Sequence, residues 1–304
     1  MDKKSRLFRA TDIMLIVLAI LPIIFGMVLK VLTNPPSSDI EITGAKIYFI
    51  LKMPFMDLPI SESQVNSWIV VLSVLFLCLW FTHGIKEGRT PKRQLVCEFI
   101  VEKTEGLVRD NMDGYFKGFA PFAAAIMAIS AFSSLLTLVG LYAPTADLSI
   151  IGGWSVLVFV LITYYKMKCG FLHYLGSFAD PIPLTPLNII SEVATPISMT
   201  FRHFGNVLSG SVISVLIAYF LQNLSTALFG WLPGVLGNIP LLQVGLPAIL
   251  SLYFDIFSGL LQAFIFAMLS MLYISGGFPA DDYEKRRLKK EQKRKLKGQK
   301  STAK

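Results

Sequence analysis

The sequence has 304 residues, of which 54% are hydrophobic and only 16% are charged, and its mean hydropathy is +0.60. Water-soluble domains carry about 25% charged residues, so this composition excludes an ordinary soluble globular protein and indicates a chain that has lipid as its solvent. The formal net charge is +8, which bears on membrane topology once the basic residues are assigned to individual loops.

Apolar stretches recur along the chain at lengths that suit membrane helices, since a helix needs about 20 residues to cross the hydrocarbon core. These stretches are residues 12–32, 67–84, 118–141, 152–166, 197–221 and 246–275. The first follows several basic residues, as a secretory signal would, but its apolar run is longer than a signal core and no small-residue cleavage site follows it. We therefore predict an all-α membrane protein with about six membrane helices, the first of them uncleaved.

The basic residues fall on alternate connections between these helices. Most lie in the N-terminal flank, in the segment 85–117, at Lys166 and Lys168, or in the tail after residue 276. The intervening loops hold only three lysines. Because Lys and Arg accumulate in the cytoplasmic loops of membrane proteins, both termini are predicted to be cytoplasmic.

The segments outside the apolar stretches differ in character. Residues 33–66 form an external connector without a repeat or catalytic motif, and 85–117 mixes apolar with charged positions as a helix on the cytoplasmic interface does. The basic tail, 276–304, has the composition of a nucleic-acid-binding arm, but we favour a disordered cytoplasmic flank that contacts anionic lipid. We therefore divide the chain into residues 1–66, 67–275 and 276–304, the middle part being the functional membrane domain.

Motifs of the common enzymes do not occur. The sequence has no phosphate-binding GxxxxGK[ST], no HExxH and no GxSxG, and its three cysteines lack CxxC spacing. We therefore expect no catalytic site, metal or cofactor, and look for the chemistry within the membrane.

Arg202 is the one Lys or Arg that lies away from the ends of a predicted membrane helix and outside the loops. An arginine at membrane depth costs from about 3 to more than 10 kcal/mol, so it is retained where it faces protein or water and has a function. The alternative is a structural role, in which Arg202 reaches an interface or pairs with a helix carbonyl.

A polar stripe accompanies this arginine. Residues four and seven apart share a helix face, so Arg202 lies on one face with Asn206 and Ser209. The next helix has a stripe of its own at Ser251, Asp255, Ser258, Gly259 and Gln262. Two polar stripes on consecutive helices indicate a wet contact, and Asp255 would bind a cation or exchange a proton with water. Taken singly, Gln262 and the serines are as expected for interhelical hydrogen bonding.

Two polar residues precede Arg202 on the cytoplasmic side. Asn188 and Glu192 lie four residues apart, and Pro186 and Pro196 bracket their weakly apolar stretch. Glu192 is almost three turns from Arg202, about 15 Å along a helix, which favours an aqueous access path at Glu192 over an ion pair between the two.

Residues 196–206, Pro-Ile-Ser-Met-Thr-Phe-Arg-His-Phe-Gly-Asn, resemble the P-x-S-x-x-x-R-x-F-G-N signature of the ATP synthase subunit a family. Residues 262–275 resemble the last helix of that family, 144–148 its external loop and 94–105 its interfacial stretch. The resemblance covers about residues 60–275 and leaves both ends of the chain outside it.

This resemblance implies a non-catalytic subunit of a rotary F-type ATP synthase in a bacterial plasma membrane. Its last two helices would be long and tilted and would pack against the c-subunit ring, with the b-subunit stalk and lipid as further partners and no nucleic acid. Arg202 would face the ring carboxylates, and two offset half-channels would carry protons, or sodium ions, to and from the ring. The external half-channel would use Asn206, Asp255 and Gln262, the cytoplasmic one Glu192, and the supporting positions would be Ser209, Ser211, Asn188 and Asp147.

The chain departs from the family pattern at two positions of the external path. Many members have a glutamate nine residues after the arginine and a histidine seven before the glutamine, whereas this chain has Ser211 and Asp255 there. The segment 12–32 also adds a span to the usual five. The competing hypothesis is a stand-alone secondary transporter or ion channel that binds an anion at Arg202; it predicts paired halves, which the sequence lacks. A scaffold without a transport role would leave both polar stripes unexplained.

Overall fold

The computed structural model of the protein describes residues 3–33, 44–54, 57–85, 92–112, 114–116, 118–178, 182–229, 242 and 245–302. Within these ranges, six helical segments are long and apolar enough to cross a membrane, which confirms the predicted number. The helices are α1 (Lys3–Thr33), α2 (Glu62–Thr82), α3 (Lys92–Asn111), α4 (Ala120–Leu135), α5 (Leu148–Lys166), α6 (Phe171–Phe178), α7 (Thr185–Phe229), α8 (Leu246–Ser251), α9 (Gly259–Gly276) and α10 (Ala280–Thr302).

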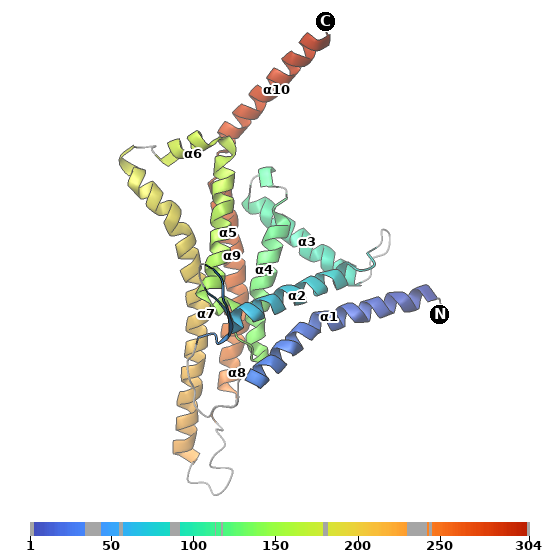
Figure 1. Cartoon of the computed structure of the whole chain (residues 1–304), viewed down its shortest axis with the longest axis vertical. Coiled ribbons are helices and arrows are strands. Elements are labelled where there is room, and N and C mark those ends of the chain that lie inside the picture. The colour runs from blue at the N-terminus through green and yellow to red at the C-terminus, as the bar shows by residue number, and fades with distance from the viewer. Residues whose placement is uncertain are drawn as a thin grey trace.

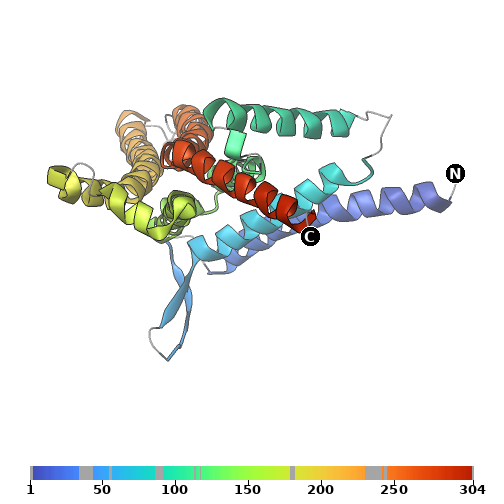
Figure 2. The ribbon, with the colours of Figure 1, turned by 90° about the horizontal axis from the view of Figure 1, so that it is seen from above.

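A β-hairpin precedes α2, in the connector to which the sequence analysis assigned no structure. Its strands, β1 (Ile47–Leu51) and β2 (Leu58–Ser61), pair antiparallel and project from the helical body (Figure 2). Ser61 ends β2 and also caps α2, because its hydroxyl accepts a hydrogen bond from Gln64 N at 3.4 Å. The hairpin is therefore joined directly to the start of a membrane helix.

Helices α1 and α2 lie side by side (Figure 1). A glycine permits their close approach, since a Cβ at Gly26 would lie 2.7 Å from Ile69 Cδ1. The apolar side chains on the other side of α1, among them Ile16, Val17 and Ile20, are exposed, as expected for a lipid-facing surface. The additional N-terminal span is thus packed against the rest of the chain.

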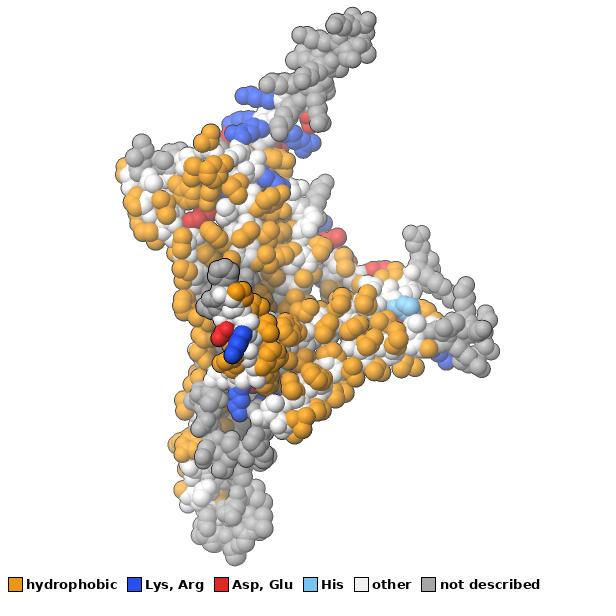
Figure 3. All heavy atoms as spheres, viewed as in Figure 1, with side chains coloured by type: hydrophobic (Ala, Val, Ile, Leu, Met, Phe, Trp, Pro, Cys, Tyr) orange, Lys and Arg blue, Asp and Glu red, His pale blue; other side chains and the backbone are white. Residues whose placement is uncertain are grey.

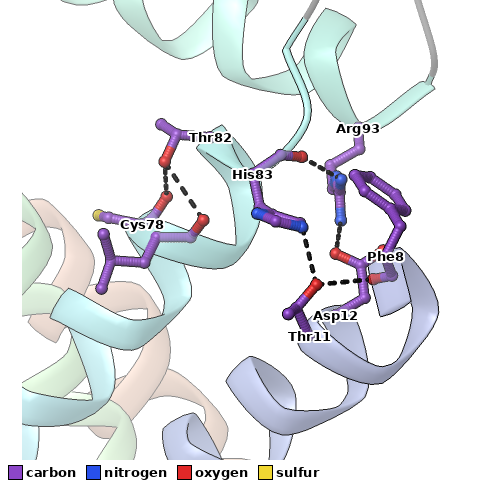
Figure 4. A network of polar contacts seen from close by, with 8 residues as sticks. Phe8, Thr11, Asp12, Cys78, Thr82, His83 and Arg93 are labelled. Atoms are coloured by element: carbon purple, nitrogen blue, oxygen red, sulfur yellow. Dashed lines mark hydrogen bonds and ion pairs between the residues drawn. The ribbon is translucent and has the colours of Figure 1, made fainter. Parts of the chain in front are cut away.

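A polar cluster fastens the beginning of α1 to the end of α2 and the start of α3 (Figure 4). Arg93 forms an ion pair with Asp12 at 2.8 Å and donates a hydrogen bond to the carbonyl of His83. The His83 ring lies 2.9 Å from Thr11 Oγ1 through its Nε2 atom and stacks on Phe8. Helix α1 is therefore held by directional contacts as well as by apolar packing.

The core of the molecule lies among α4, α5, α7 and α9 (Figure 1). Its buried side chains include Val158 of α5, Met199 of α7, and Phe266 and Met271 of α9. Helix α4 connects this core to α2 through contacts on both sides. These four helices therefore form one continuous bundle, and α7 lies along its outer side (Figure 1).

Helix α7 runs unbroken for 45 residues, well beyond the predicted stretch 197–221. At a rise of 1.5 Å per residue it is about 68 Å long, more than twice the hydrocarbon thickness of about 30 Å, so it can lie within a bilayer only at a steep tilt. Pro196 is inside the helix without ending it, and the Thr200 hydroxyl bonds to the Pro196 carbonyl at 2.8 Å.

The basic tail is a helix, which corrects the expectation that it is disordered. Helix α10 extends away from the helical body (Figure 1). Its sequence is rich in good helix formers, Asp281 and Asp282 lie in its first turn where they suit the helix dipole, and Arg287 pairs with Glu291 one turn later at 3.1 Å. These local contacts favour a helix although the segment is too charged to be buried.

Apolar side chains cover most of the face shown in Figure 3, and charged side chains gather at the foot of α10. On α3, Leu95, Phe99 and Glu102 are exposed while Val108 and Met112 are buried. The helix predicted within 85–117 is thus present, and its location on the cytoplasmic interface stays a prediction.

Candidate functional site

Arg202 is exposed on α7. Its surface neighbours include the apolar Phe201 and Ile197, which are 58% and 50% exposed, and the polar Asn206 and Ser209 of its own stripe. Among the described residues, the Arg202 guanidinium has no ion pair or hydrogen bond. The structure therefore presents an exposed, unpaired cation beside apolar side chains, and at membrane depth its charge is costly unless another molecule supplies an anion or water.

The two predicted polar stripes meet beside Arg202. Asn206, one turn further along α7, donates a hydrogen bond from Nδ2 to Ser258 Oγ at 2.8 Å, and Ser251 Oγ donates to Asp255 Oδ2. Ser258 and Asp255 belong to a π-helical turn, Leu252–Ser258, that interrupts the predicted last helix between α8 and α9. Such turns are frequent at functional sites because they redirect side chains within a helix.

The other predicted positions near Arg202 separate into buried and exposed groups. Gln262, one turn after Ser258, is 5% exposed and therefore lies within the bundle. Ser209 and Ser211 are exposed on α7, and the Ser211 hydroxyl bonds to the Leu208 carbonyl at 2.9 Å. The structure thus brings Asn206 to the Asp255 turn but leaves Ser211, which occupies the family's glutamate position, on the outer surface.

Glu192 lines a cavity of about 450 Å³, which we term the Glu192 cavity. Its carboxylate forms an ion pair with Lys166 at 2.5 Å, and Ser191, Thr195 and Tyr273 supply further polar groups to the wall. A polar cavity of this size holds several waters. Glu192 thus lines a polar cavity and the aqueous path there stays a prediction, while the ion pair with Lys166 was missed.

Two residues at this end of the bundle have structural roles. Asn188 donates from Nδ2 to the Phe178 carbonyl at 3.1 Å, which ties α7 to the end of α6. Tyr174 of α6 lines the Glu192 cavity, and burial, assisted by the negative charge of Glu192, raises the pKa of its hydroxyl. The tyrosine therefore stays a neutral hydroxyl there at physiological pH.

Asp147 lies at the opposite end of α5 and lines a second cavity of about 550 Å³, which we term the Asp147 cavity. Asp147 caps α5, because Ser149 N donates to its Oδ1 atom at 2.9 Å, and Ser63 donates to its Oδ2 atom. Burial, followed by the charges of Asp147 and Glu62, raises the pKa of nearby Tyr142. Along α5 the Asp147 cavity is lined as far as Trp154 and the Glu192 cavity from Phe159, so five residues, about 8 Å of helix, separate the two linings.

The sequence analysis missed two residues of this region besides the hairpin. Lys166 was assigned a topological role only, although it neutralises Glu192. His203, the residue after Arg202, is 1% exposed and points into the bundle. No sequence pattern distinguished it, since its orientation depends on which face of α7 is packed, and only the folded bundle determines that face.

The fold and the site together define a polytopic helical membrane protein of the ion-transporting class, with an exposed arginine between two polar cavities. Residues 64–275 match the ATP synthase A chain family, and the chain belongs to that family. It is thus a non-catalytic membrane component of the F0 part of an F-type ATP synthase. This assignment does not favour the alternative of a stand-alone transporter or channel.

Bacterial relatives agree with this assignment. The chain is similar to the ATP synthase subunit a of Desulforamulus reducens, with 30% identity over 227 residues that cover 72% of this chain and 80% of the relative. It is 29% identical to the subunit a of Bacillus pumilus over 240 residues, 73% and 93% of the two chains. With that of Legionella pneumophila strain Paris it shares 25% identity over 228 residues, 74% and 90% of the two chains.

Proposed function

We propose that Arg202 contacts the carboxylates of a c-subunit ring and that the two cavities are the ends of two half-channels leading to that ring. The Glu192 cavity would open to the cytoplasm and the Asp147 cavity to the outside. Ions then enter through one cavity, bind to the ring carboxylates, are carried by rotation of the ring and leave through the other cavity. Asn206, Asp255 and Gln262 belong to the external path, and Glu192 to the cytoplasmic one.

The observation that carries this proposal is the unpaired guanidinium of Arg202, an exposed residue that lies beside the exposed apolar side chains of Phe201 and Ile197. A carboxylate passing in front of it is stabilised in its ionised form, because a nearby cation lowers carboxyl pKa values. The same charge repels a cation that would move directly from one half-channel to the other. A fixed arginine thus promotes release of the ion from the ring carboxylate and also separates the two paths.

The positions of the cavities support an offset pair of paths. They lie at opposite ends of α5, and the Asn206 to Ser258 contact lies beside Arg202 on the long helix that accompanies α5. The two cavities have no lining residue in common, and neither includes Arg202 in its wall, which supports two separate paths. Passage through the ring is then the route that joins them, which couples ion flow to rotation.

The orientation follows from the basic residues. The foot of α10 and the Lys166 end of α5 are on the side with most Lys and Arg, which we assign to the cytoplasm. Both termini are then cytoplasmic. The exposed apolar surfaces away from Arg202 are available to a b-subunit stalk and to lipid.

The test is ATP-driven ion pumping in vesicles that contain the whole complex with Arg202→Ala. Pumping is expected to be lost while the c-ring still co-purifies with the chain. Arg287→Ala, which removes an exposed arginine on α10, is the matched control and should pump normally. An assembled Arg202→Ala complex that pumps like wild type would contradict the proposal, and so would the absence of a ring from the purified wild-type complex.

A further inference from the structure

His203 is a buried titratable residue for which the proposed mechanism has no role. It is 1% exposed, its Nε2 atom lies 3.4 Å from Ser130 Oγ on α4, and its Nδ1 atom has no hydrogen-bond partner among the described residues. Its ring contacts Trp154 and Phe266 edge-on, with centroids 6.3 and 5.5 Å away. A buried nitrogen without a partner costs free energy comparable to a lost hydrogen bond.

A second unpartnered atom lies at the same level of the bundle. Ser155 of α5 is 1% exposed, and its Oγ atom also lacks a partner among the described residues. Helices α5 and α7 run antiparallel, since the end of α5 pairs with the early part of α7 through Lys166 and Glu192. Ser155 precedes Lys166 by as many residues as His203 follows Glu192, about 16 Å along each helix. The two unsatisfied atoms are therefore at a similar height in the bundle, and each leaves a polar group for which an internal water is the usual partner.

Polar groups continue from His203 in both directions. Trp154, which touches the His203 ring, also lines the Asp147 cavity. On the other side, Ser134 lies one turn beyond Ser130 on α4, and a Cβ at Gly259 would be 2.6 Å from Ser134 Oγ.

The path then reaches the predicted site. Ser258, the residue before Gly259, accepts the hydrogen bond from Asn206. His203 therefore lies between the Asp147 cavity and the Asn206 to Ser258 contact.

We propose that His203 is a proton relay in the external half-channel and that this path carries protons rather than sodium ions. This inference rests on the proposed function above. The ring takes up a proton at Nδ1 from the Ser155 side and becomes an imidazolium. It then releases the proton on Nε2 toward Ser130, which leaves a neutral ring with its proton on Nδ1; rotation of the ring restores the starting arrangement. Uptake breaks an O–H bond of the donor and forms an N–H bond, and release breaks an N–H bond and forms an O–H bond on the acceptor, so one proton enters and one leaves in each cycle.

The chemistry of an imidazole favours this choice of ion. Sodium is a hard cation that takes oxygen ligands, and a ring with one nitrogen beside the Ser130 hydroxyl and the other without a partner among the described residues offers it little. Imidazole, in contrast, accepts and donates protons within the physiological range. A relay through His203 also accounts for an external path without the family's glutamate, which Ser211 replaces on the outer surface.

The experiment measures proton flux in vesicles that contain the whole complex, in sodium-free medium, with His203→Ala and His203→Gln. ATP-driven pumping and passive flux after removal of the F1 part should both fall by about a hundredfold, the lower end of what a positioned proton-transfer group contributes. Imidazole added to His203→Ala should restore flux, whereas pyrazole, which has the same size but is far less basic, should not. His83→Ala, which lies in the α1 cluster, is the control and should show no response to imidazole.

Several results would overturn the relay. They are wild-type flux with His203→Gln, rescue by pyrazole as well as by imidazole, and loss of flux that imidazole leaves unchanged. If His203→Ala does not assemble, His203→Gln decides, because glutamine retains the hydrogen bonds but takes up no proton. A wild-type complex that pumps only with sodium present would also refute the inference. The proposed function is tested separately, since Arg202→Ala abolishes pumping whether or not His203 conducts.

Discussion

Replacing Gly259 with alanine tests how closely α9 must pack on α4. A Cβ at this position would lie 2.5 Å from Ser134 Cβ and 2.6 Å from Ser134 Oγ, whereas nonbonded carbon atoms prefer about 3.5 to 4 Å. The clashing atoms belong to a short side chain next to the α4 backbone, so they have little freedom to move away. The substitution should therefore push α9 and α4 apart.

The magnitude follows from two opposing effects. Overpacking a close-packed interior costs about 1 to 3 kcal/mol, and alanine gains up to about 1 kcal/mol over glycine inside a helix. We expect a net destabilisation of about 1 to 2 kcal/mol. Gly106→Ala is the matched control, because Gly106 is also in a helix but its Cβ would meet only Arg109 Nη2, at 3.9 Å. That change should be neutral or stabilising.

The assay is the temperature at which heating releases the chain from the purified complex, measured with ATP-driven pumping on the same samples. Gly259→Ala should lower this temperature and slow pumping, because Ser258 and its bond to Asn206 are adjacent. A second change, Ser134→Gly, removes both clashing atoms and should recover much of the loss, as a double-mutant cycle would reveal. The reasoning is refuted if Gly259→Ala behaves like Gly106→Ala, or if Ser134→Gly brings no recovery.

Two further substitutions test single contacts. Asp12→Asn should weaken the cluster that fastens α1 by about 1 kcal/mol or less, because the ion pair with Arg93 is partly exposed. The first amides of α1 should then exchange their hydrogens faster. Unchanged exchange would mean that apolar packing alone holds α1. Asp147→Ala should lower the release temperature through loss of the α5 cap, worth about 1 kcal/mol. Asp147→Asn still accepts from Ser149 N and should retain most of the stability that the cap contributes. Equal losses in the two variants would exclude the cap as the cause.

The membrane spans were predictable because each is a long apolar run whose identity depends on composition alone. Their ends were less so. Helix α7 begins at Thr185, since the polar residues Asn188 and Glu192 are accommodated by a hydrogen bond to α6 and by Lys166. Neither partner is visible from the sequence of α7 itself. The same holds for the π-helical turn at Asp255, which depends on contacts with α7.

The candidate site divides in a similar way. Arg202 and Asn206 were predictable from the signature and from helical spacing, and the structure brings Asn206 to Ser258 as two facing stripes imply. His203 and the serines of α4 were not, because an interior serine or histidine looks like ordinary helix packing until its partners are known. Ser130 becomes a candidate site residue only because the Nε2 atom of His203 lies 3.4 Å from its hydroxyl.

The pair formed by Lys166 and Glu192 distinguishes a conducting carboxylate from a structural one. Glu192→Gln and Lys166→Met break the same ion pair, whose side chains are 13% and 25% exposed, so each should cost stability to a similar extent, about 1 to 3 kcal/mol. They leave opposite charges beside the Glu192 cavity. Glutamine leaves the Lys166 ammonium unpaired, and methionine leaves the carboxylate.

The interaction energy of a cation with an unpaired charge about 6 Å away is about 0.7 kcal/mol at an effective dielectric constant of 80 and about 3 kcal/mol at 20. That energy changes the occupancy of the cavity by the cation by about three- to hundredfold. If ions pass Glu192, pumping per assembled complex should fall by that factor in Glu192→Gln and equal or exceed wild type in Lys166→Met, with the double variant, which leaves no charge, in between. Equal losses in the two single variants would show that the pair only holds α5 to α7, and the cytoplasmic path would then have to avoid Glu192.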